Sequence, residues 1–291
     1  MSADFHRKLA MSKIEGLATW KKCWPVWETE IRARTGNLAD PEKVLKLGGQ
    51  LREVFFATNT GSRDQGALSG GGTGWEALVT WYLNLVLSGT NAVAVRQSKA
   101  TVPLTLLDAT TITYGSHQTN TEADVSVIIY PRDFSFPAVP KEFLANLDKE
   151  VKRRFSEIEL SIIQCKTNWN DNAQIPMLWD MVYKADFGNV ANIHLGRGGF
   201  VATRLKRFTY AFVTVPSQKE GKMPSKSDQM AVKRVANLSG GNYWGMPTKS
   251  GVALSLGEIF TRPFANAFKK DVQASIKDAM DGRLGLFADL T

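Results

Sequence analysis

The sequence predicts an α/β protein, with a mixed central β-sheet flanked by helices and an N-terminal helical preface. Three observations carry this prediction. Apolar residues recur at helical spacing through the first 56 residues, two strongly apolar stretches at 123–130 and 159–166 have strand character, and helical patterns separate and follow them. Hydrophobic residues make up 43% and charged residues 22% of the 291 residues, which is ordinary for one globular domain spanning 1–291.

The helical preface is expected over residues 1–57. Pro25 and the stretch 37–41 are expected to divide it into separate helices. Its three tryptophans stand at helical spacing and are predicted to be core residues: Trp20, Trp24 and Trp27.

A loop rich in glycine and serine follows at 58–74, and a strongly amphipathic helix is predicted from Thr73 to Leu87. Thr73 suits the N-cap of this helix, and Glu76 stands three residues later, as in a capping box.

The α/β core is predicted over residues 73–215. Its strands are expected at 92–95, 101–107, 123–130, 159–166 and 208–215, and its later helices at 141–155 and 173–185. The remaining part, 216–291, is expected to hold a basic loop and a C-terminal helix from about 256 to 280.

Positive charge is concentrated in one part of the chain. The net charge is +8 and the isoelectric point is about 9.4. Between Arg197 and Ser250, ten Lys or Arg residues stand against two acidic residues, so this segment alone carries a charge equal to that of the whole chain. Such a concentration favours a polyanionic partner, most commonly nucleic acid, although a solvated basic surface accounts for the composition equally well.

Two strands carry the residues best suited to chemistry. Asp124 opens the first strand, and Gln164 and Lys166 end the second, where their spacing of two places both side chains on one face. Hydrolysis of a phosphodiester needs a metal ion to polarise the phosphate and a cation near the developing charge. The Asp124 carboxylate, the Gln164 side-chain carbonyl and the backbone carbonyl of Cys165 could bind Mg²⁺, while Lys166 orients water or stabilises the phosphate.

These residues resemble the signature of the PD-(D/E)XK nuclease superfamily, in which an Asp opens one strand and an acid-X-Lys triplet ends the next. The matching stretches read EADVSVII and ELSIIQCK, and the likeness covers about residues 122–170. The sequence departs from the pattern in two places, with Ala123 where Pro is usual and Gln164 where Glu or Asp is usual. The resemblance implies a restriction-endonuclease-like core, a Mg²⁺ cofactor and the activity of a type II restriction endonuclease.

Glu76 is a further candidate for the metal site. Many nucleases of this superfamily carry a Glu near the metal on a helix that precedes the core, and such a residue would compensate for the charge missing at Gln164. Its alternative role is that of the capping-box residue in its own helix.

Contact with DNA is predicted in the basic region, through phosphate contacts or contacts to base edges. The candidate side chains are Lys219, Lys222, Lys226, Lys233, Arg234 and Asn242. Two histidines outside this set, His117 and His194, lack metal-ligand spacing and are predicted to be ordinary loop residues.

The expected partner is double-stranded DNA, and the resemblance implies a homodimer that acts alongside a cognate DNA methyltransferase. No segment is apolar and long enough to suggest a membrane span or a signal peptide, and the two cysteines suggest no disulfide framework, so a cytoplasmic location is expected. Two alternatives stay open: a repair, recombination or structure-specific nuclease of the same fold, and a DNA-binding protein that has lost its activity.

Overall fold

The computed structural model describes residues 2–36, 38, 40–58, 72–120, 123–138, 140–167, 193–215, 235, 238–243, 257–260, 264, 266–268 and 272–283. Its helices are α1 (Ala3–Glu15), α2 (Ala18–Thr35), α3 (Pro41–Phe56), α5 (Gly72–Val86), α6 (Leu104–Ala109), α7 (Phe143–Arg153), α10 (Gly257–Phe260) and α11 (Val272–Arg283), with short 3-10 turns at Phe155–Glu157 and Ala202–Arg204. Its strands are β1 (Ala92–Arg96), β2 (Thr111–Tyr114), β3 (His117–Asn120), β4 (Val125–Ile129), β5 (Glu159–Lys166), β6 (Ile193–Leu195), β7 (Arg207–Thr214) and β8 (Asn242–Tyr243). Within these residues, no helix is both long and apolar enough to cross a membrane.

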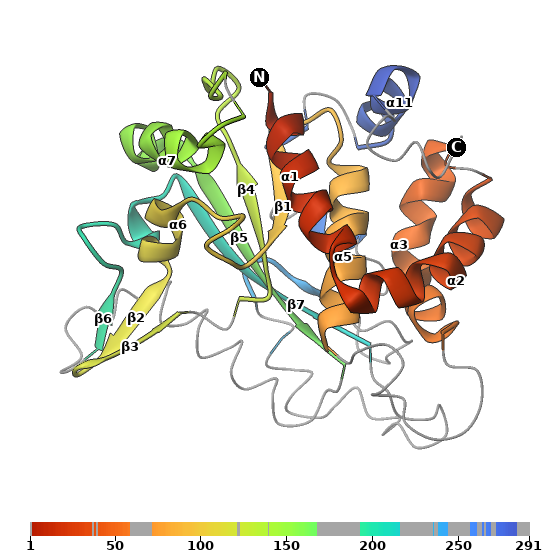
Figure 1. Ribbon diagram of the computed structural model, residues 1–291, viewed down its shortest axis with the longest axis horizontal. Coiled ribbons are helices and arrows are strands. Elements are labelled where there is room, and N and C mark those ends of the chain that lie inside the picture. The colour runs from red at the N-terminus through yellow and green to blue at the C-terminus, as the bar shows by residue number, and fades with distance from the viewer. Residues whose placement is uncertain are drawn as a thin grey trace.

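The centre of the molecule is a mixed sheet of five strands in the order β1-β4-β5-β7-β8 (Figure 1). The first three strands pair antiparallel, whereas β7 runs parallel to β5 and β8 runs parallel to β7. The strands β4 and β5 match the two apolar stretches of the sequence, and the predicted α/β class with a mixed sheet flanked by helices is confirmed.

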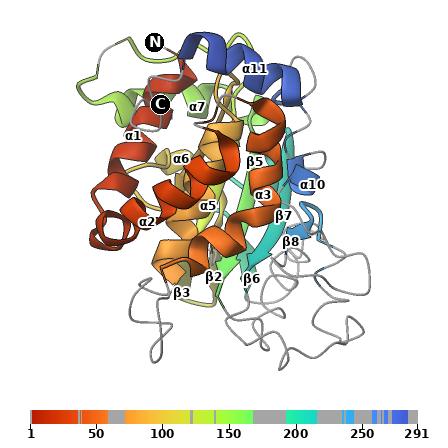
Figure 2. The same cartoon turned by 90° about the vertical axis from the view of Figure 1, so that its right-hand side faces the viewer.

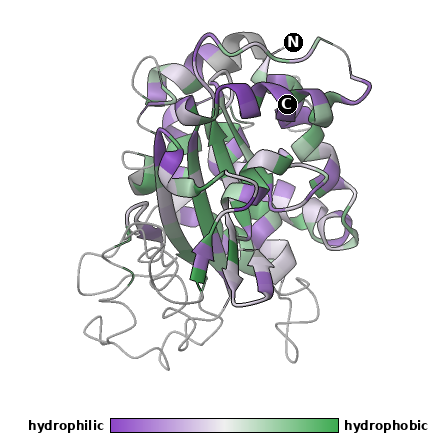
Figure 3. Ribbon diagram, turned by 90° about the vertical axis from the view of Figure 1, so that its left-hand side faces the viewer, coloured by the Kyte–Doolittle hydropathy of each residue, from purple (hydrophilic) through white to green (hydrophobic). Residues whose placement is uncertain are grey.

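Two clusters of buried side chains cover the two faces of this sheet. On one face α2, α3 and α5 pack against alternate residues such as Ile163 and Val213. On the other face α6 and α7 pack against the intervening residues, such as Ile162 and Phe212. Burial on both faces explains the continuous apolar character of the central strands, which Figure 3 shows in green.

The preface consists of three helices, and the expected division at 37–41 is confirmed between α2 and α3, whereas the one at Pro25 is wrong. Pro25 lies inside α2 rather than between helices. The chain breaks instead at Gly16, the C-cap of α1. Trp20 and Trp27 are buried and the partly buried Trp24 packs against them, as predicted.

Three other predicted boundaries are corrected. The stretch 101–107, expected as a strand, contains the start of the short helix α6, whose N-cap is Pro103. Thr73 is the second residue of α5 and therefore not its N-cap. The C-terminal helix is not continuous, because the described residues between α10 and α11 are not helical. The predicted helix at 173–185 lies outside the described residues.

A second, three-stranded sheet in the order β3-β2-β6 was not predicted. The strands β2 and β3 form a hairpin whose loop is Gly115–Ser116, with Gly115 at φ 58°. A two-residue Gly-Ser loop after a β-rich stretch is a recognised hairpin signal, so the sequence did carry this information. The histidines His117 and His194, expected in loops, lie on β3 and β6.

Helix α1 covers the edge strand β1 and is held there by a buried histidine. His6 Nε2 lies 2.7 Å from the carbonyl oxygen of Thr101, and Nδ1 lies 2.9 Å from the hydroxyl of Tyr130. A neutral ring satisfies both contacts, donating from one nitrogen and accepting at the other. Burial, aided by the neighbouring positive charge of Arg7, lowers the pKa of His6 to about 4.

Acidification is therefore expected to destabilise the fold through His6. The pKa of the ring is about 4 in the folded protein and about 6.5 in the unfolded chain. Between these values the unfolded chain binds the extra proton, so stability falls as pH falls. The loss should reach about 2 kcal/mol between pH 8 and pH 5. Urea unfolding of the wild type and of His6→Gln at pH 8 and pH 5 measures this loss of stability. An equal loss in the two proteins would show that His6 does not cause it.

Candidate active site

Asp124, Gln164 and Lys166 lie together at one end of the central sheet. The β4–β5 register pairs Val125 with Ile163, so Asp124, one residue before Val125, stands across from Gln164. Lys166 is the last residue of β5, two positions further on. Residues that are paired or two apart share a face of a sheet, so all three belong to the face covered by α6 and α7.

The Asp124 side chain is attached to β5 by a hydrogen bond. Its Oδ2 accepts the backbone N–H of Cys165 at 2.6 Å, while its backbone carbonyl accepts the N–H of Gln97 in the direction of β1. An ionised carboxylate has about four acceptor positions and can accept an amide while also binding a cation. The carboxylate is thereby held beside the Gln-Cys-Lys triplet.

Gln164 is fully buried, and Lys166 is half-buried at the strand end. The hydroxyl of Tyr210, on β7, donates to Gln164 Oε1 at 3.4 Å. This contact identifies Oε1 as an acceptor within the site. Cys165 points to the opposite face and is buried as predicted, and burial, with Asp124 and Glu76 nearby, raises the pKa of its thiol well above the usual value.

Three polar residues from neighbouring strands extend this face. Thr214 is paired with Lys166, and Asn242 is paired with Phe212, the partner of Gln164. Among the described residues, the buried oxygens Thr214 Oγ1 and Asn242 Oδ1 have no hydrogen-bond partner. Tyr210 is the third, and neither it nor Thr214 was identified from the sequence. The alternation of side chains along β7 could have placed Tyr210 and Thr214 on this face, but only once the pairing of β7 with β5 was known.

Glu76 lies at the same end of the sheet but is paired with another side chain. Its Oε2 lies 2.7 Å from Arg96 Nη2, in an ion pair that joins α5 to the end of β1. The helix α5 covers the face of Cys165, whereas Gln164 and Lys166 belong to the other face. Sequence reasoning missed Arg96, because no local pattern links residues twenty positions apart.

The oxygen donors of the site fit the sparse coordination that Mg²⁺ prefers. Across the described part of the chain, no group of three or more His, Cys, Asp or Glu side chains could hold a metal ion. Mg²⁺ does not require such a group, since it is commonly bound by one or two carboxylates, with waters and substrate phosphates completing the shell. Asp124 and the amide oxygen of Gln164 meet this sparse requirement, and the orphaned oxygens of Thr214 and Asn242 add polar groups on the same face. The Cys165 carbonyl as a third ligand stays a prediction.

The basic region is divided in space. Arg204, Lys206 and Arg207 lie at or before the start of β7, and Lys206 pairs with Glu159 at the start of β5. An eight-residue strand separates Arg207 from Thr214 by about 23 Å, so these charges lie at the end of the sheet opposite the site. The predicted contacts Lys219, Lys222, Lys226, Lys233 and Arg234 lie outside the described residues. Asn242 is buried, and its Nδ2 donates to the carbonyl of Val235 at 3.3 Å.

No protein-family model matches the chain, and the comparison with curated proteins gives no match.

Proposed function

We propose that the chain is a Mg²⁺-dependent endonuclease of the PD-(D/E)XK type that hydrolyses phosphodiester bonds in double-stranded DNA at specific sites, as type II restriction enzymes do. One observation carries the proposal. Asp124 stands across from Gln164 on neighbouring antiparallel strands, and Lys166 follows on the same face at the end of the sheet.

The chemistry requires an activated water, a polarised phosphate and stabilisation of the negative charge on the phosphate oxygens. Asp124 and Gln164 would hold Mg²⁺, which supplies the polarisation and lowers the pKa of water. The ammonium group of Lys166 orients the attacking water or stabilises the phosphate. The hydrogen bond from Cys165 fixes the Asp124 carboxylate, and that from Tyr210 fixes the amide oxygen of Gln164.

The arrangement of the central strands adds support for a restriction-endonuclease-like core. The strand opened by Asp124 pairs antiparallel with the strand that ends in Lys166, and β7 then pairs parallel to it. A helix, α5, precedes these strands and brings Glu76 to the same end. In this proposal the protein works in the cytoplasm as a homodimer, whose two active sites address the two DNA strands, beside a cognate methyltransferase.

A second candidate is a DNA-binding protein that has lost cleavage. It is favoured by Gln164, which is neutral and fully buried where a carboxylate would bind Mg²⁺ more strongly. Both candidates bind DNA, and only the first one cuts it.

Digestion of unmethylated DNA separates the candidates. The purified protein should produce discrete fragments in Mg²⁺ and none in EDTA, and Lys166→Ala should slow cutting by about a hundredfold, the effect of removing one stabilising donor. Lys149→Ala, an exposed lysine on α7, is the matched control and should cut normally. A smear that EDTA and Lys166→Ala both abolish would favour a nuclease of low specificity, such as a repair nuclease. Binding without cutting in Mg²⁺ or Mn²⁺ would favour the inactive DNA-binding protein.

A further inference from the structure

The small β3-β2-β6 sheet has one apolar face and one polar face. Ile112, with its partner Leu195, faces the core. The adjacent row crosses all three strands and consists of Gln118, Thr113 and His194, because Thr113 pairs with both of the others. Gln118 and His194 are exposed and Thr113 is half-buried, so this row faces solvent.

Arg197, just beyond β6, fixes the orientation of Gln118 in this row. Its Nε donates to Asp108 Oδ1 at 3.0 Å, and its Nη1 donates to Gln118 Oε1 at 3.4 Å. The N–H of Gly196 donates to Thr111 O at 2.7 Å and ties Arg197 to the sheet. Because arginine can only donate, the oxygen of the Gln118 amide must face Arg197, and the NH₂ group must point away from it.

The row therefore presents an amide oriented by Arg197 beside a hydroxyl and an imidazole. The ion pair with Asp108 compensates the charge of Arg197, so this surface adds little to attraction by phosphates. An amide, a hydroxyl and an imidazole are groups that donate to and accept from base edges. Strands are about 4.8 Å apart, and a two-stranded antiparallel ribbon, such as the β2–β3 hairpin, can enter the major groove. The chemistry of the row suits base recognition better than phosphate binding.

The sheet is also tethered close to the candidate active site. Figures 1 and 2 place β2 and β3 at the lower end of the molecule, towards which β5 and β7 run. From Gln118 to Asp124 the chain has six residue steps, so their Cα atoms cannot be further apart than about 21 Å. At 3.4 Å per base pair, this distance corresponds to about six base pairs.

We infer that the β2–β3 hairpin, together with β6, reads base edges in the DNA groove within about six base pairs of the bond that is cut. The row Gln118, Thr113 and His194 makes the contacts, and Arg197 acts as the positioning residue for Gln118. This inference rests on the proposed nuclease function, for which it supplies the source of sequence specificity.

Selection of binding sequences tests the inference independently of cleavage. The full chain in EDTA is equilibrated with a pool of random-sequence duplex DNA, and the bound DNA is sequenced for the wild type, Gln118→Ala and His194→Ala. His117→Ala is the matched control, since His117 is also exposed but is paired with Tyr114, on the alternate face. Cleavage sites of the same proteins are then mapped in Mg²⁺.

The wild type and His117→Ala should enrich the same short sequence. Gln118→Ala and His194→Ala should lose preference at one or two neighbouring positions, with affinity for the specific site falling roughly 10- to 100-fold. Their affinity for other DNA and its salt dependence should stay unchanged, because no phosphate contact is removed. Unaltered preferences in both variants, with site-specific cleavage intact, would overturn the inference and leave the nuclease proposal standing. A wild type that neither selects nor cuts DNA would overturn both.

Discussion

Replacing Asp124 with Asn is expected to lower the rate of DNA cleavage by about a thousandfold, because the substitution removes the carboxylate proposed to bind Mg²⁺. A bound metal supplies several kcal/mol of charge stabilisation, and each 1.36 kcal/mol corresponds to a factor of ten in rate. The amide oxygen of Asn can still accept the N–H of Cys165, which Asp124 Oδ2 accepts at 2.6 Å. Cleavage time courses across a range of Mg²⁺ concentrations measure the effect, and calorimetric titration with Mn²⁺ should show weaker binding.

Asp133→Asn is the control for the loss of one negative charge. Asp133 is exposed and lies outside the site, and its hydrogen bond from Arg154 holds the pKa of its carboxyl below the usual value, so it is an ionised carboxylate paired with a cation. This variant should cleave DNA at the wild-type rate. Equal rates for the wild type and Asp124→Asn would remove Asp124 from the active site.

The elements that create this site could be predicted because their signals are local. The strand β5 coincides with the predicted stretch 159–166, and β4 lies within 123–130. The alternation of side chains along a strand then assigns Gln164 and Lys166 to one face and Cys165 to the other. In agreement, Cys165 belongs to the buried cluster on one face of the sheet, and Phe212, the partner of Gln164, belongs to the cluster on the other face. The face of Asp124 follows from the register, which the sequence alone could not supply.

The incorrect predictions arose where tertiary packing outweighs local preference. Pro25 stays within α2, which buries Trp20 and Trp27 on either side of it, and packing compensates for the lost backbone hydrogen bond. The second half of the β-rich stretch 101–107 becomes helical because Leu106 and Leu107 enter the core from α6, beside α7. The pairing of Glu76 with Arg96 depends on α5 lying across the end of β1, and no sequence pattern reports that contact.

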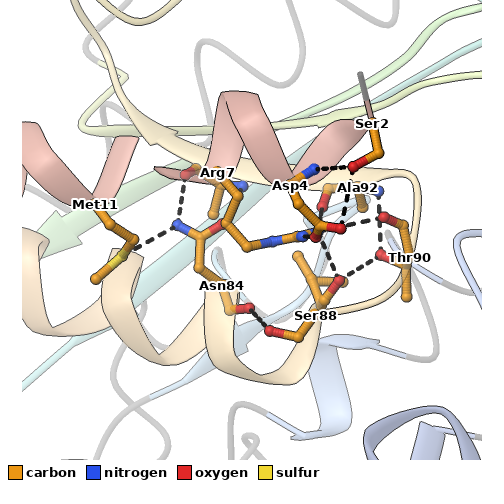
Figure 4. Close-up of polar contacts among 10 residues, drawn as sticks. Ser2, Asp4, Arg7, Met11, Asn84, Ser88, Thr90 and Ala92 are labelled. Atoms are coloured by element: carbon orange, nitrogen blue, oxygen red, sulfur yellow. Dashed lines mark hydrogen bonds and ion pairs between the residues drawn. The ribbon is translucent and has the colours of Figure 1, made fainter. Parts of the chain in front are cut away.

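Arg7, a residue of α1, connects the helical preface to the core of the molecule. The guanidinium is fully buried and donates to the carbonyl oxygens of Leu87 at 2.8 Å and Ala92 at 2.7 Å, and to that of Thr90 at 3.3 Å. It also pairs with Asp4, as Figure 4 shows. These carbonyls follow the C-terminus of α5, where a cation is favoured by the helix dipole.

Arg7→Met is expected to lower the free energy of unfolding by about 3–5 kcal/mol, because a fully buried guanidinium and the charge-assisted hydrogen bonds that it donates to backbone carbonyls are lost. The carbonyls that Arg7 satisfies would lose a donor while remaining buried, and Asp4 would lose its counter-ion. Urea unfolding at pH 7 measures the change. The control is Arg32→Met, which breaks a partly exposed pair with Glu28 one helical turn away and should cost less than about 1 kcal/mol.

Cleavage should survive Arg7→Met when it is measured below the unfolding temperature of the variant. Arg7 contacts the start of β1, at Ala92, whereas Arg96 and the candidate active site lie at the other end of the sheet. A folded Arg7→Met protein that cuts DNA at the wild-type rate would show that α1 stabilises the core without taking part in catalysis. A large loss of rate in the folded variant would instead mean that the docking of α1 controls the geometry of the distant strand ends, through β1 and its neighbour β4.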